Sequence, residues 1–218
     1  TSTGIDILVG TPPTPVIISP VGGHTFSGNE SIELIGSAGL IGDGTQLIWT
    51  TGFIHDDHVH PMGTKLLGPN QNFVVPYTGH AFEGKSGIRV SLTAISSNGL
   101  SDTTTLFIYP DKVSQVFATT PPGLSVKVDN VLRKTPFVLD TMNGFHHAID
   151  IPPQCLDHTQ YEPISANQQA VVSEHAFTLV VDAQKQGVLL VAFKAGITPC
   201  VPTLPDAGLV LQLDAGIG

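Results

Sequence analysis

The sequence predicts an all-β protein, built as an antiparallel β-sandwich followed by a second, smaller β domain. Three observations support this class. Apolar and polar residues alternate over short segments, which is the period of a half-buried strand. The chain contains 23 glycines and 17 prolines, which separate these segments at short intervals. No segment has a helical apolar period, so we expect short strands joined by turns.

The first expected domain covers residues 1–110. Residues 31–38 alternate apolar and polar side chains and predict a half-buried strand. Pro76 places the short strand at 72–76 on a sheet edge, because proline cannot donate a hydrogen bond to a neighbouring strand. Trp49 is the only tryptophan, and we expect it in the sandwich core. The other expected strands of this domain are residues 4–9, 16–20, 46–53, 87–95 and 103–110.

The second expected domain covers residues 111–218. Residues 177–183 and 187–195 give the clearest strand patterns of this part, and a turn at 121–123 precedes another strand. The remaining segments are also short and apolar, without a helical period. They predict strands at residues 113–118, 124–129, 135–139, 144–151 and 209–213.

Composition limits the partners that the chain can have. The formal net charge is −9, and the nine Lys and Arg residues form no cluster, which argues against nucleic acid and anionic membrane surfaces. No apolar run approaches the roughly 20 residues of a membrane span. The expected partners are polysaccharides, other extracellular proteins or a second copy of the chain.

The most unusual stretch is the six-residue segment 55–60, which holds three histidines and two aspartates. On a strand, His58 and His60 share one face. His55 has the opposite parity and joins them only if the chain bends or bulges near the aspartates. Three neutral imidazoles from so short a segment fit Zn²⁺ or Cu²⁺. The alternative interpretation is a polar loop with solvated histidines.

His80 is the candidate fourth ligand, because it follows the expected edge strand in a loop and a sandwich gathers such loops at its ends. Four histidines would close a structural metal site, whereas three would leave a position open for water. We interpret Asp56 and Asp57 as acceptors that hold imidazole N–H groups around the metal, with solvated turn residues as the alternative.

Two further observations predict a secreted protein. Cys155 and Cys200 are the only cysteines; a disulfide between them would suit an extracellular chain, and two buried free thiols are the alternative. Asn29 begins the sequon Asn29-Glu30-Ser31, so it is the expected glycosylation site.

Residues 47–49 and the run from His55 to Pro61 resemble the PKD-like, immunoglobulin-like module found towards the C-terminus of secreted sorbosone/glucose-dehydrogenase-like PQQ proteins. A later stretch resembles a PEGA-type β unit. The resemblance covers residues 14–153 and implies an Ig/PKD-like sandwich followed by a PEGA-like domain. Its other segments are residues 75–76, 78–80, 89–94 and 98–102 for the first module, and 117–129 and 135–137 for the second.

The chain departs from these multidomain proteins in three places. No propeller sequence is present, so the resemblance implies an accessory module that binds no PQQ and has no dehydrogenase chemistry. The acidic turn near Asp43 is shortened, and the part after Cys155 lacks the Gly/Trp-rich ending of the family.

Three functions are compatible with these patterns. The first is a secreted, non-catalytic, metal-binding β module that acts in extracellular binding or assembly at a cell surface or polysaccharide. The second is a metal-dependent enzyme or redox accessory module with an open three-histidine site. The third is a structural adhesion or matrix protein without metal. No nucleophile elbow, P-loop or dinucleotide fingerprint is present, no residue is assigned a catalytic role, and we predict the first function.

Overall fold

The computed structural model describes residues 10–39, 44–79, 82–167, 169–170, 175–185 and 187–200. The described residues form strands and a single 3-10 turn, so the predicted all-β class is confirmed. No helix within these ranges is long and apolar enough to cross a membrane. The chain divides into two compact units, the first made of residues 1–116, 138–147 and 178–187, the second of residues 117–137, 148–177 and 188–218.

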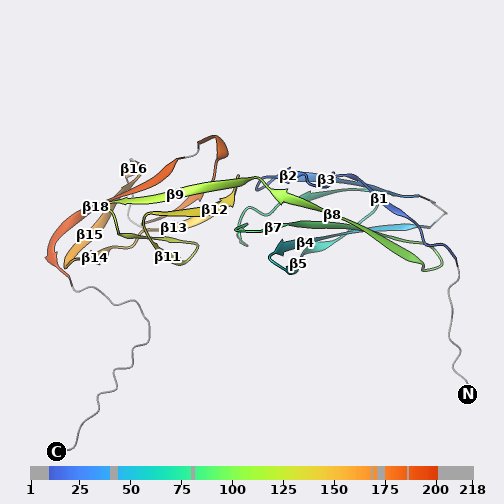
Figure 1. The fold of residues 1–218 in the computed structure, drawn as a ribbon, viewed down its shortest axis with the longest axis horizontal. Helices are drawn as coiled ribbons and strands as arrows, with labels where there is room; N and C mark the ends of the chain where they lie inside the picture. The colour runs from blue at the N-terminus through green and yellow to red at the C-terminus, as the bar shows by residue number, and fades with distance from the viewer. Residues whose placement is uncertain are drawn as a thin grey trace, which may run out of the picture. The chain divides into compact units, whose positions relative to one another are not determined.

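The first unit contains two sheets that pack face to face, drawn from blue to green in Figure 1. The smaller sheet has the order β1-β3-β6, and the larger has the order β2-β8-β7-β4-β5. Strand β6 lies at a sheet edge, as Pro76 predicted. The strands are β1 (Pro15–Ser19), β2 (Thr25–Phe26), β3 (Ser31–Ala38), β4 (Gln46–His55), β5 (His58–Leu67), β6 (Asn70–Val74), β7 (Ser86–Ile95) and β8 (Ser101–Pro110).

The core of the first unit follows the alternation seen in the sequence. In β3 every second residue is buried, beginning at Ile32. Trp49 is fully buried among the inward residues of both sheets, as predicted, and its Nε1 donates to the carbonyl of Gly68 at 3.0 Å. Gly36 lies beside the Trp49 and Leu92 side chains, in a space that a Cβ atom would invade. The two sheets are thus held together by a closely packed apolar interior.

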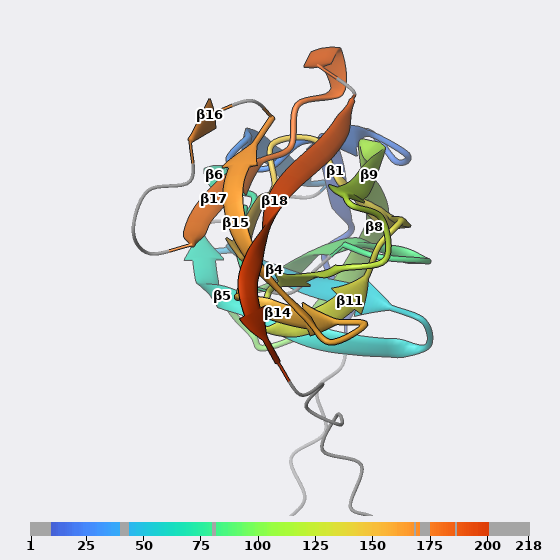
Figure 2. The same ribbon diagram turned by 90° about the vertical axis from the view of Figure 1, so that its left-hand side faces the viewer.

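The later strands form two further sheets, with the orders β11-β10-β13-β17 and β12-β9-β18-β15-β14. Figure 2 shows β18 lying along β15, in agreement with their antiparallel register. The strands are β9 (Lys112–Thr120), β10 (Ser125–Val128), β11 (Val131–Lys134), β12 (Phe137–Met142), β13 (His146–Asp150), β14 (Gln154–Leu156), β15 (Thr159–Ala166), β16 (Gln169–Ala170), β17 (Ala176–Val180) and β18 (Val188–Pro199), and the 3-10 turn covers Ala183–Lys185.

Cys155 and Cys200 form a disulfide across 45 positions of the sequence, so the predicted pairing is confirmed. The bond joins β14 to the residue that follows β18, and the backbone N–H of Cys200 donates to the carbonyl of His158 at 3.1 Å. It therefore reinforces the pairing of β14 and β18 with the strand between them. The strands predicted at residues 4–9 and 209–213 lie outside the described residues.

Candidate functional site

The histidine-rich segment forms a tight hairpin between β4 and β5. His55 pairs directly with His58, and Phe53 pairs with His60. Asp56 and Asp57 make the two-residue turn, with Asp56 at a φ of 51°. Residues that lie opposite each other in a hairpin share a face of the sheet. The chain reversal therefore brings all three imidazoles to one face. It is the bend near the aspartates that His55 needed in order to join His58 and His60.

Two of these imidazoles converge closely. The Nε2 atoms of His55 and His60 are 3.1 Å apart. The ring planes differ by 9°, and the ring centroids are 5.1 Å apart. Rings stacked face to face would have nearly equal separations of centroids and of nitrogens. Here the centroids are 2.0 Å farther apart than the nitrogens (5.1 − 3.1 Å), so the rings meet through their Nε2 edges. At this distance one Nε2 must present a lone pair to the other.

The separation of the two nitrogens is close to the separation that a metal ion requires. Two imidazole nitrogens at about 2.05 Å from a tetrahedral Zn²⁺ lie about 3.3 Å apart. The third imidazole, His58, has its ring centroid 6.0 Å from that of His55 and is 71% exposed. Because its side chain is mostly exposed, the buried core does not fix its rotamer. The hairpin thus presents a convergent pair and a third histidine on the same face.

Within the part of the chain that the structure describes, no group of three or more His, Cys, Asp or Glu side chains is arranged to hold a metal ion as it stands. His80, the candidate fourth ligand, lies outside the described residues. The three-histidine and four-histidine ligand sets therefore stay predictions, and the convergent pair is the part that the geometry supplies.

The two aspartates lie on the Nδ1 side of the imidazoles. Asp56 Oδ2 is 3.7 Å from His55 Nδ1, and Asp57 Oδ1 is 4.0 Å from His58 Nδ1. Both distances exceed a hydrogen bond, and the carboxylates are 75% and 93% exposed. The carboxylates therefore lie near the Nδ1 atoms of His55 and His58 without bonding to them. Their role as acceptors around a metal remains a prediction.

Two neighbours of the cluster were not expected from the sequence. The ring of His55 packs against Phe53, which is buried and belongs to the core. Ser86 pairs with His55 across β4 and β7 and is 8% exposed, and its Oγ has no hydrogen-bond partner among the described residues. His58, His55 and Ser86 therefore form one row across three strands. Only the strand register reveals this row, since Ser86 is remote from the histidines in sequence.

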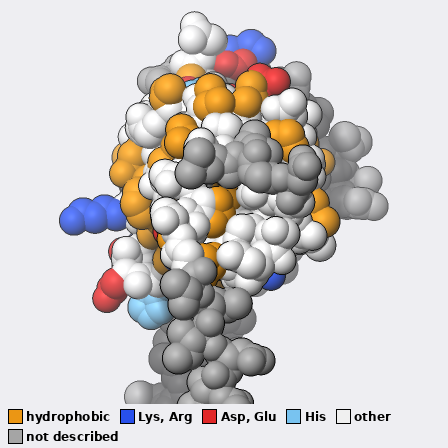
Figure 3. Space-filling view, turned by 90° about the vertical axis from the view of Figure 1, so that its right-hand side faces the viewer, with side chains coloured by type: hydrophobic (Ala, Val, Ile, Leu, Met, Phe, Trp, Pro, Cys, Tyr) orange, Lys and Arg blue, Asp and Glu red, His pale blue; other side chains and the backbone are white. Residues whose placement is uncertain are grey.

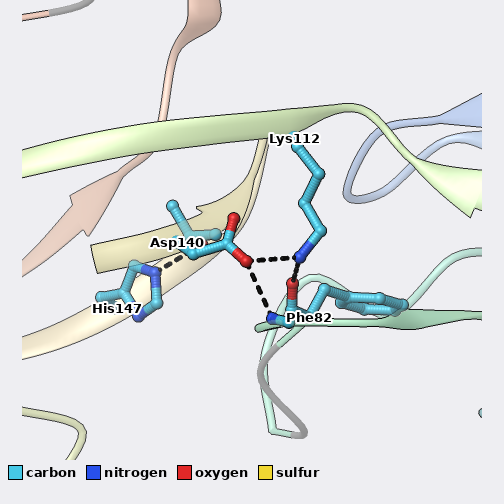
Figure 4. Close-up of polar contacts among 6 residues, drawn as sticks. Phe82, Lys112, Asp140 and His147 are labelled. Carbon is cyan, nitrogen blue, oxygen red and sulfur yellow. Dashed lines mark hydrogen bonds and ion pairs between the residues drawn. The ribbon is translucent and has the colours of Figure 1, made fainter. Parts of the chain in front are cut away.

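A polar cluster fixes the segment that precedes β7 (Figure 4). The Lys112 ammonium donates to the carbonyl of Phe82 and to the Asp140 carboxylate, the latter at 2.9 Å. The backbone N–H of Gly84 donates to the same Asp140 oxygen at 2.8 Å. In the same view, the fully buried His147 lies with its Nε2 2.8 Å from the Thr141 hydroxyl. This cluster holds the backbone beside the hairpin in one position.

The remaining predicted site residue, Asn29, is exposed in a turn, where its φ is 64°. The following residue, Glu30, accepts from the backbone N–H of Ser27 at 2.8 Å and lies 3.2 Å from the ring of His24. The sequon is therefore accessible in an ordered turn, and glycosylation of Asn29 stays a prediction.

Comparison of the chain with family models, with curated proteins and with solved structures gave no significant match. The resemblance to PKD-like and PEGA-like modules therefore stays a prediction that depends on the residues quoted for it.

Proposed function

We propose that this chain is a secreted, non-catalytic, metal-binding β-sandwich module that acts in extracellular binding or assembly. The metal is Cu²⁺ or Zn²⁺, bound through the Nε2 atoms of His55 and His60 with His58 as the third ligand. The observation that carries the proposal is the 3.1 Å approach of the two Nε2 atoms on one face of a hairpin.

The environment of the hairpin suits a metal better than it suits a plain hydrogen bond. Exposed imidazoles can each bind water, so two of them gain little from meeting edge to edge in solvent. A divalent ion between them would accept a lone pair from each nitrogen, and imidazole is a preferred ligand of both Zn²⁺ and Cu²⁺. The packing of His55 against the core residue Phe53 holds one ligand in place before the ion arrives. Such preorganisation lowers the entropy lost on binding.

The extracellular part of the proposal is supported by the disulfide and by the exposed Asn29 sequon. Disulfides persist in oxidising compartments and are rare in the cytosol. An exposed hairpin that carries a metal can gather a further ligand from a polysaccharide or protein at a cell surface, because three histidines leave a coordination position open.

The test is metal stoichiometry and affinity of the full chain against a double variant, His58→Ala/His60→Ala. We expect the wild-type chain to bind one Zn²⁺ or Cu²⁺ by isothermal titration calorimetry. At a metal concentration of 100 times Kd, binding would stabilise the fold by about 2.7 kcal/mol. The double variant should lose both effects. His158→Asn is the matched control, because His158 also follows an aspartate in a hairpin turn and has a φ of 62°, which asparagine tolerates.

Absence of stoichiometric metal in the wild-type chain, together with an unchanged melting temperature on adding either ion, would refute the proposal. Equal binding by the wild type and by His58→Ala/His60→Ala would also refute it, since the metal would then lie elsewhere.

A further inference from the structure

The outer face of the five-stranded sheet carries a hollow on the side opposite the buried core. Its volume is about 530 Å³, and its lining includes Ile54, Asp56, Lys85, Gly87, Phe107 and Tyr109. This volume lies within the range of roughly 300 to 1,000 Å³ that small-ligand sites occupy. All of its lining residues belong to the first unit.

The strand register shows how the hollow is built. Ile108 is fully buried, so its neighbours Phe107 and Tyr109 point outward, and they are 43% and 50% exposed. Gly87 lies between Tyr109 on one side and Ile54 on the other, and a Cβ on Gly87 would come within 3.2 Å of the Tyr109 ring. The missing side chain leaves space at Gly87, and the Cδ1 and Cε1 atoms of the Tyr109 ring lie beside that space. Phe107 lies two residues along the strand, about 7 Å away.

Two cations, Lys85 and Arg89, lie near these rings. Arg89 pairs directly with Phe107 across β7 and β8, and Lys85 lines the hollow; both are exposed, and neither forms an ion pair with another described residue. The chain has only nine Lys and Arg residues and a net charge of −9. Figure 3 shows that Lys and Arg side chains are also few on the face that it draws, where hydrophobic and uncharged atoms predominate. Two unpaired cations beside two exposed rings therefore form a local exception to the charge of the protein.

The other polar groups of the hollow limit the chemical class of ligand that it can bind. Asp56 also lines the hollow, and its carboxylate is 75% exposed. It would accept hydrogen bonds from the hydroxyl groups of a ligand. Lys112, at the other wall, is already bound to Asp140 and to the Phe82 carbonyl. Among the described residues, Lys85 is therefore the lining cation that has no ion pair. Arg89 lies outside the lining, on β7 with its Nη2 near Gly52, and its guanidinium can recognise a carboxylate that extends beyond the hollow through two parallel hydrogen bonds.

We infer that this hollow binds a saccharide chain that carries carboxylate groups, a polyuronate. A sugar ring has an apolar C–H face for Tyr109 and Phe107 and hydroxyl groups for Asp56, and a uronate adds the carboxylate for Arg89 and Lys85. Nucleic acid fits less well, because its charge density requires many more cations than the two available here. The inference does not depend on the metal site, whose imidazoles lie on the other face of β4.

The experiment uses the full chain in EDTA and low salt, titrated with α-1,4-linked tetragalacturonate by isothermal titration calorimetry and by ¹H–¹⁵N NMR. We expect saturable binding that weakens with added NaCl and shifts the amides of residues 84–87 and 105–109. A neutral glucose tetrasaccharide should bind at least about tenfold more weakly. Lys85→Gln/Arg89→Gln should also lose about tenfold in affinity.

The matched control is Lys134→Gln/Lys194→Gln, which changes the net charge equally at exposed positions of the second unit. It should bind tetragalacturonate like the wild type. Phe107→Leu and Tyr109→Leu keep apolar cover over the sheet but remove the flat ring, and each should weaken binding with an unchanged melting temperature. Any of three results would overturn the inference: no binding of tetragalacturonate, equal losses in the two double variants, or unchanged affinity in both leucine variants.

Discussion

Replacing Gly36 by alanine should destabilise the first unit by about 2 kcal/mol. A Cβ at this position would lie 2.4 Å from Leu92 Cδ2 and 2.7 Å from Trp49 Cζ2. Carbon atoms pack best at about 3.5 to 4.0 Å, so Leu92 or the strand must move by about 1 Å. Trp49 cannot move easily, because it is fully buried and its Nε1 is bonded to Gly68. Overpacking of this kind costs about 1 to 3 kcal/mol.

The assay is urea denaturation followed by the fluorescence of Trp49, which reports on the first unit because it is the only tryptophan of the chain. Gly22→Ala is the matched control, since a Cβ there meets nothing within 4 Å and the glycine has no left-handed φ. It should change the free energy of unfolding by no more than about 0.5 kcal/mol. If Gly36→Ala also stays within 0.5 kcal/mol of the wild type, the close packing between the two sheets is not as the structure has it.

Three further outcomes are expected. Cys155→Ala/Cys200→Ala should cost the second unit up to about 4 kcal/mol, because the disulfide closes a loop across 45 positions; hydrogen exchange of the β15 amides would show this, and a loss below about 1 kcal/mol would contradict it. Ser86→Ala should raise the melting temperature slightly, because it removes a buried hydroxyl without a partner in the described chain; a clear loss of stability would reveal a hidden partner. The backbone N–H of Gln184 lowers the pKa of Asp182 by bonding to its carboxylate. The ionised carboxylate should therefore stabilise the fold at neutral pH, and this contribution should disappear as the pH falls through the lowered pKa. An ordinary aspartate pKa for Asp182 in an NMR titration would refute this.

Much of the first unit could be predicted from the sequence because its strands alternate cleanly. Residues 31–38 form β3 with the predicted limits, and the burial of Trp49 followed from its large apolar area. Strand limits were predicted less well where two strands are joined by a hairpin turn without glycine. The turn Asp129-Asn130, which joins β10 and β11, has φ values of 47° and 68°, and Asp157-His158, between β14 and β15, has φ values of 48° and 62°. Aspartate, asparagine and histidine tolerate this conformation, but their presence alone does not mark a turn.

The arrangement of the candidate metal cluster also could not be predicted fully from the sequence. The three histidines were evident from their spacing, but parity along a single strand separated His55 from the other two. The reversal at Asp56 places them on one face, and the strand register that decides this depends on tertiary pairing. For the same reason the hollow near Tyr109 could not be found in the sequence. It is made by side chains of different strands and by the absence of one at Gly87.

The β4–β5 hairpin belongs to both proposed sites, which raises the question of whether they are coupled. His55 faces the imidazole cluster, while Asp56 lines the hollow on the opposite face. The backbone N–H of Asp56 donates to the carbonyl of Lys85 at 3.1 Å, so the turn is already fixed against the segment before β7 without a metal. Because the turn has the same conformation before and after the metal binds, the metal has no second conformation of the turn to favour. We therefore expect Zn²⁺ to change the affinity for tetragalacturonate less than about twofold, and by reciprocity the saccharide to change the affinity for Zn²⁺ equally little. A change above about fivefold in both titrations would show that the hairpin has two arrangements, and that the fixed turn seen here is only one of them.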